Sequence, residues 1–90
     1  GRQPGAPSLA PLIYGRVLEV AAWEAGAGAL PYESLYTELL LDIGFGRIGV
    51  RTSLTAASLA AELGTPQLEP GDLIELTRSR IDILAFEPEP

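Results

Sequence analysis

The clearest structural signal in the sequence is the segment E-S-L-Y-T-E-L-L-L-D-I, residues Glu33–Ile43. From Leu35 onward every second residue is apolar or Thr, and this period of two is typical of a strand with one buried face. Gly44–Gly46 then turns the chain, and Arg47–Thr52 continues the alternation as the second strand of a hairpin. The charges on the outer face are expected to pair across this hairpin, Arg47 and Arg51 with Glu38 or Asp42.

The rest of the chain adds three more strands and one helix. The strands are predicted at Leu12–Ala22, Leu73–Thr77 and Arg80–Phe86, which are rich in Leu, Ile, Val and aromatic residues. The helix is predicted over Thr55–Leu63, because Ala-rich sequence follows hydroxyl residues that can cap it, and Gly64 can end it. The order β-β-β-α-β-β predicts a mostly-β domain, and closure of its five strands into a small barrel would remove the exposed sheet edges.

Length and composition predict a single domain. The chain has 90 residues, 47% of them hydrophobic, which suits one small packed core. We expect residues 12–86 to form the β-barrel domain, 1–11 to be a flexible arm rich in Pro and Gly, and 87–90 to be a tail. A core of this size is marginal, so self-association is a natural way to bury more surface.

The composition leaves few residues able to run catalysis. The sequence contains no Cys and no His, so disulfides, thiolate metal sites and the usual zinc, copper and iron ligand sets are absent. Lys is absent too, so no neutral base stands ready to activate a Ser or Thr nucleophile. We therefore expect no enzyme, no catalytic residues and no metal, and no cofactor other than a bound oxyanion.

The net charge of −6 bears on the class of partner. An acidic chain repels the phosphate backbone of nucleic acids and the surface of anionic membranes. No apolar run approaches the roughly 20 residues that a membrane span needs, and no signal peptide is evident. The expectation is a cytoplasmic protein that binds neither nucleic acid nor membrane.

Several motifs resemble those of the Mop/TOBE domains, which are small OB-like β-barrels that bind molybdate or tungstate. They are Gly15-Arg16-Val17, L-T-A-A-S at Leu54–Ser58, Leu63-Gly64, and L-E-P-G-D-L-I-E-L at Leu68–Leu76. The resemblance covers residues 12–86 and implies an OB-like five-stranded barrel with one short helix between strands 3 and 4. It also implies that the oxyanion contacts lie at Ser53, Leu54, Thr55, Ser58 and Ser8.

The residues themselves support an anion site at the same place. A helix that begins near Thr55 offers free backbone N–H groups and the positive end of its dipole. The hydroxyls of Ser53 and Ser58 add further donors within a few ångströms. These short contacts outweigh the screened field of the net charge.

A weaker resemblance links the chain to the AbrB-like swapped-hairpin domains, which bind DNA. It rests on Gly46-Arg47-Ile48 through Leu63-Gly64 and on Pro70–Leu76. It leaves residues 12–43 without a counterpart, and the acidic net charge has the wrong sign for DNA. DNA binding therefore ranks third among the functions considered.

The leading hypothesis is a non-catalytic interaction or regulatory module that acts through a protein partner or through its own oligomer. Large apolar and aromatic residues are favoured interface anchors, and we expect contacts at Trp23, Leu30, Tyr32, Tyr36 and Leu40. The alternative is a domain that binds an oxyanion such as molybdate, tungstate or sulfate, or another small ligand.

Overall fold

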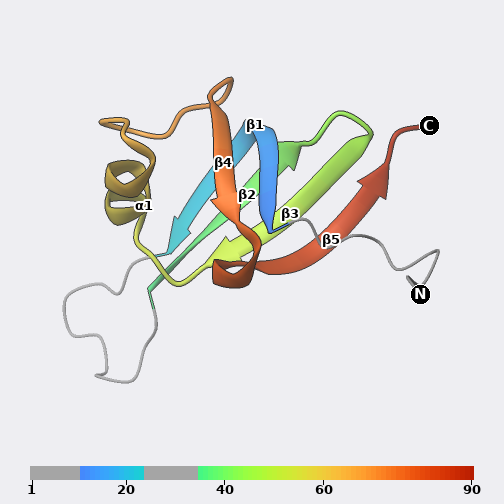
Figure 1. The fold of residues 1–90 in the computed structure, drawn as a ribbon. Coiled ribbons are helices and arrows are strands. Elements are labelled where there is room, and N and C mark those ends of the chain that lie inside the picture. The colour runs from blue at the N-terminus through green and yellow to red at the C-terminus, as the bar shows by residue number, and fades with distance from the viewer. Residues whose placement is uncertain (1–10, 24–34) are drawn as a thin grey trace.

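The computed structural model describes residues 11–23 and 35–90, which form one antiparallel sheet and a short helix (Figure 1). The sheet has five strands in the order β4-β1-β2-β3-β5. The predicted mostly-β fold, with its helix between the third and fourth strands, is confirmed. The bounds are β1 Leu12–Trp23, β2 Tyr36–Asp42, β3 Gly46–Thr52, α1 Ala56–Leu63, β4 Leu73–Thr77, the 3-10 helix η1 Arg78–Arg80 and β5 Asp82–Pro88.

The hairpin of β2 and β3 forms the middle of the sheet, as its alternation predicts. Leu39 lies opposite Val50 and Leu41 lies opposite Ile48, and all four are buried. On the other face Arg51 donates to Glu38 at 2.6 Å, one of the charge pairs expected across the hairpin. The hairpin thus supplies both the centre of the core and a charged outer face.

Strand β1 pairs with two neighbouring strands. Its first half pairs with β4 and its second half pairs with β2, with an irregularity between Val17 and Glu19. Gly15 lies close to β2, and a Cβ there would sit 3.1 Å from the Leu41 Cβ. A glycine at this position permits the close approach of the two backbones, and the irregularity follows a few residues later.

The helix α1 begins and ends as its sequence predicts. Thr55 is the N-cap, and Gly64 ends the helix in the left-handed region at φ +77°. The helix buries Leu59 and Ala60 against the sheet. It lies at the opposite end of the sheet from the C-terminal end of β5 (Figure 1).

The connection between β4 and β5 requires the sheet to curl. A flat five-stranded sheet would place its two edge strands about 19 Å apart. The link from Thr77 to Asp82 runs through η1 and reaches only about 13 Å. The two edges therefore meet at η1, and β4 and β5 leave it in different directions (Figure 1). In the described ranges β4 and β5 do not pair with each other, so the sheet stays open along both strands.

The last strand is displaced from its predicted position. It begins at Asp82 rather than Arg80, because Arg78–Arg80 is taken up by η1. It also continues beyond Phe86, since Pro88 still lies opposite Gly46 in β3. Within the described residues, no helix is long and apolar enough to cross a bilayer.

Candidate functional site

The four described residues of the predicted oxyanion site lie together at the start of α1, but several of their donors already have partners. The Thr55 hydroxyl accepts from the Ser58 N–H at 3.1 Å and donates to the Ser58 hydroxyl at 3.0 Å. The Leu54 N–H donates to the Thr52 hydroxyl at 3.3 Å. Ser53 is exposed, and Ser8 lies outside the described residues. This helix start is thus largely capped by its own side chains.

A hollow of about 280 Å³ opens beside Ser53 and Leu54, and two arginines are among the residues that line it. Arg51 comes from β3 and Arg80 comes from η1, which the curl of the sheet brings close. Asp82 lines the same hollow and offsets part of their charge. The sequence gives no sign of Arg80 here, because its approach depends on the curl of the sheet.

Both arginines are held by carboxylates. Arg51 pairs with Glu38 at 2.6 Å, and this hydrogen bond raises the pKa of the Arg51 guanidinium, which stays charged. Arg80 pairs with Glu62 of α1 at 3.0 Å. An anion in the hollow would therefore meet cations that are already partly neutralised.

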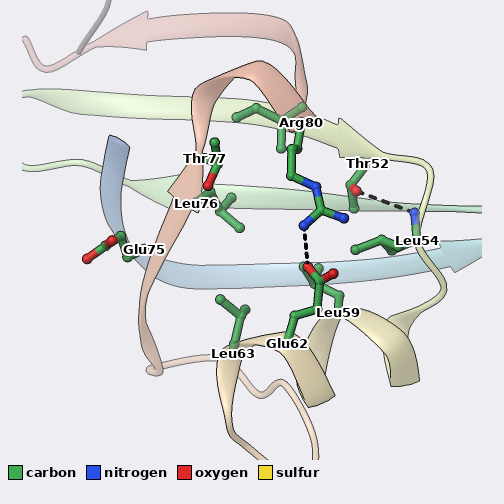
Figure 2. Close-up of a pocket in the computed structure, with 10 residues that line it drawn as sticks. Thr52, Leu54, Leu59, Glu62, Leu63, Glu75, Leu76, Thr77 and Arg80 are labelled. Atoms are coloured by element: carbon green, nitrogen blue, oxygen red, sulfur yellow. Dashed lines mark hydrogen bonds and ion pairs between the residues drawn. The ribbon is translucent and has the colours of Figure 1, made fainter. Parts of the chain in front are cut away.

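A second cavity of about 310 Å³ lies between α1, β4 and the end of β3. Figure 2 shows the Arg80 side chain reaching from η1 toward Glu62 across it. Apolar side chains such as Leu63 and Leu76 line much of the remainder. Neither this lining nor any other group of described residues gathers the acidic ligands that a metal ion would need.

The third candidate is the edge strand β5, which pairs only with β3 among the described strands. All seven of its residues are exposed, and they include the large apolar side chains Ile83, Leu84 and Phe86. Phe45, in the turn between β2 and β3, is also exposed and packs at a tilt on Phe86 with the ring centroids 6.0 Å apart. An open strand of this composition is the type of edge that accepts another chain.

Of the five contact residues predicted from sequence, the structure describes the side chains of Tyr36 and Leu40. Tyr36 and Leu40 are only half-buried side chains on the outer face of β2, and Arg51 stacks on the Tyr36 ring at 4.7 Å. The backbone of Trp23 pairs with Tyr36 at the end of β1. Leu30 and Tyr32 lie outside the described residues.

The sequence patterns do not predict that β5 is exposed along its whole length. The signal available was the unbroken apolar run Ile83–Phe86 between two acidic residues, which does not alternate as a half-buried strand should. Such a run fits a strand buried on both faces as well as an exposed one. Only the strand order, which places β5 at an edge of the sheet, distinguishes the exposed strand from the buried one.

Comparison of the chain with protein-family models, with curated proteins and with solved structures finds no match. The function is therefore argued from the described residues. Two features carry the argument, the apolar edge of β5 and the hollow beside Ser53.

Proposed function

We propose that this domain is a non-catalytic interaction module that binds an extended segment of another polypeptide along the free edge of β5. The observation that carries the proposal is the exposure of the whole strand, apolar residues included. Isolated exposed apolar residues are ordinary on protein surfaces. A run of them on an unpaired strand offers main-chain hydrogen bonds and side-chain contacts together, which is how strand addition works.

The hydrogen bonds of β5 limit the length of the binding edge. The Glu89 N–H donates to the Phe45 carbonyl at 3.1 Å, so Glu89 faces β3. Main-chain groups of successive residues point to opposite sides of a strand, so the nitrogen of Pro88 faces the free edge. Proline has no N–H to donate there. An added strand therefore pairs along Asp82–Phe86 and stops at Pro88.

The side chains of this segment offer apolar contacts on both faces of the sheet. Ile83 and Phe86 lie opposite Val50 and Ile48, which places them on the core face. Leu84 lies on the outer face, where a Cβ on Gly49 would be 4.0 Å from the Leu84 Cβ. An added strand would cover apolar surface on both of its sides.

The proposed architecture is an OB-like barrel that is left open between β4 and β5. Two features support it: the helix lies between the third and fourth strands, and the two edge strands meet at η1. The resemblance of the motifs to Mop/TOBE domains points to the same class. In such an arrangement the edge of β5 is available because β4 does not cover it.

The test uses a labelled seven-residue peptide of alternating Val and Thr, with fluorescence anisotropy as the readout. A second peptide carries N-methyl groups on alternate amides, so one of its edges has no donors. The Val/Thr peptide should bind and the N-methylated peptide should not. The Phe86→Thr variant should weaken binding by about tenfold or more, or ~1.4 kcal/mol. Leu73→Thr, which alters an exposed apolar residue of β4, should leave the affinity unchanged.

Two results would overturn the proposal. One is equal binding of the N-methylated peptide, because strand addition depends on the peptide's amide donors. The other is an equal loss of affinity in the β4 variant, because binding would then not depend on β5. Circular dichroism of both variants checks that they keep the sheet.

A second candidate function is oxyanion binding in the hollow beside Ser53. The presence of Arg51 and Arg80 in its lining favours this function. Calorimetric titration with molybdate, tungstate and sulfate tests it, and Arg80→Gln should abolish any heat of binding. Absence of heat at millimolar concentrations of all three anions would exclude this function.

A further inference from the structure

We propose that the edge of β5 selects a segment with basic residues on either side of its apolar ones, and that it rejects a second copy of this chain. This inference rests on the proposed function, because it names the partner of the same edge. It is carried by the charges at the two ends of the apolar run.

Asp82 and Glu87 bracket the apolar run Ile83–Phe86, and both are exposed. In the ladder they lie opposite Arg51 and Arg47 of β3, which places both carboxylates on the outer face. Neither carboxylate forms an ion pair with the arginine opposite it in the described ranges, although the charge of Arg51 also acts on Asp82. Arg51 forms its ion pair with Glu38, and Arg47 forms none within the described ranges.

The same charges disfavour pairing with a second copy. Directly opposed residues share a face of a sheet, and the antiparallel register that pairs the whole apolar run with itself sets Ile83 against Phe86 of the second copy. Leu84 then meets Ala85 of the second copy, and both of these lie on the outer face beside Gly49. The next pair is Asp82 against Glu87 of the second copy. Two-fold symmetry repeats this opposition of like charges, which is destabilising.

A partner strand with Lys or Arg opposite Asp82 and opposite Glu87 would replace the repulsion between like charges at each position with an attraction. Its apolar residues would cover Ile83 and Phe86 on one face and Leu84 on the other. The net charge of −6 acts in the same direction, because it steers a basic segment toward the domain over longer distances. The acidic ends of β5 thus serve two purposes, protection against self-pairing and choice of partner.

The experiment compares two labelled peptides that share an Ile-Thr-Val-Thr-Ile centre and are flanked by Lys in one and by Glu in the other. At low salt the Lys-flanked peptide should bind about tenfold more tightly, and added salt should reduce the difference. In the double variant Asp82→Asn, Glu87→Gln the two peptides should bind with similar affinity. The control variant Glu69→Gln, Glu75→Gln changes the net charge equally but lies away from β5, and it should keep most of the preference.

Sedimentation equilibrium supplies the second readout. The natural domain should be a monomer, and the Asp82→Asn, Glu87→Gln variant should associate at high concentration. Equal binding of the Glu-flanked peptide, or an equal loss of preference in the control variant, would overturn the inference and leave the proposed function standing. A dimer of the natural domain that depends on Phe86 would also overturn it. If neither peptide binds, the proposed function itself fails.

Discussion

Phe86 lies directly opposite Ile48 on the core face of the sheet, yet Ile48 is 4% exposed and Phe86 is 46% exposed. One strand spacing therefore separates the interior of the domain from its surface. Ile48 has strands on both sides, whereas Phe86 has β3 on one side and an open edge on the other. Among the described residues no further element covers β5, so the core ends at that strand.

Because the strands of the central hairpin bury one face, truncating a residue on the buried face should lower the free energy of unfolding more than truncating one on the outer face. Leu41 is fully buried and its neighbour Leu40 is half-buried on the other face. Leu41→Ala should lower the free energy of unfolding by about 3 kcal/mol, since it leaves a cavity in a small core. Leu40→Ala should cost about 1 kcal/mol or less. Urea denaturation measures both, and equal losses would mean that the strand does not present one buried face.

Two glycines of β3, Gly46 and Gly49, provide a test variant and a matched control for the pairing of β5 with β3. A Cβ at Gly46 would lie 2.5 Å from the Glu87 carbonyl oxygen, whereas one at Gly49 would meet nothing closer than 4.0 Å. Gly46→Ala should therefore push the end of β5 away and cost about 1–3 kcal/mol, while Gly49→Ala should be nearly neutral. Faster amide exchange at Glu89 in the Gly46 variant would report the lost bond to Phe45. Unchanged exchange there would contradict the β3–β5 register.

The cap of α1 should depend on one hydroxyl. Thr55→Ala removes the acceptor for the Ser58 N–H and should cost about 1 kcal/mol. Thr55→Ser keeps the hydroxyl and should recover most of that loss. Thermal unfolding followed by circular dichroism measures both variants. If Thr55→Ser is as unstable as Thr55→Ala, the hydroxyl is not the source of the stability.

Tyr14 should give the domain a dependence on alkaline pH. Its hydrogen bond with Glu75, together with the charge of that carboxylate, raises the pKa of Tyr14 above its ordinary value. Because the folded state holds this proton more tightly, the stabilisation is present below pH ~10 and is lost as the pH rises through the folded pKa. The stability gap between the natural domain and Tyr14→Phe should therefore shrink above pH ~10. Urea midpoints on both sides of that pH measure it, and a constant gap would contradict the interaction.

Local sequence patterns predicted the elements of this fold well. The hairpin alternation, the cap at Thr55 and the stop at Gly64 each depend on residues close together in the chain. The pairing of β1 with β4, and the edge position of β5, depend on contacts across the whole sheet. The sequence could therefore predict five strands and a helix, but not which strands stay open.

The candidate sites show the same limit. The oxyanion prediction grouped Ser53 to Ser58, which lie together because they are close in sequence. It could not show that Thr55 and Ser58 satisfy each other, nor that Arg80 arrives from η1. The predicted contact surface rested on the exposure of single residues, whereas the exposed surface of β5 follows from strand order. The approach of Arg80 and the exposure of β5 both depend on tertiary geometry, which local sequence patterns do not show.

The most direct measurement is backbone amide exchange by NMR, with and without the Lys-flanked peptide. If the peptide adds a strand to β5, exchange should slow along Asp82–Phe86 and stay unchanged along β4, the other free edge of the sheet. Slower exchange in Leu73–Thr77 or in α1, with β5 unaffected, would contradict the assignment of the binding edge.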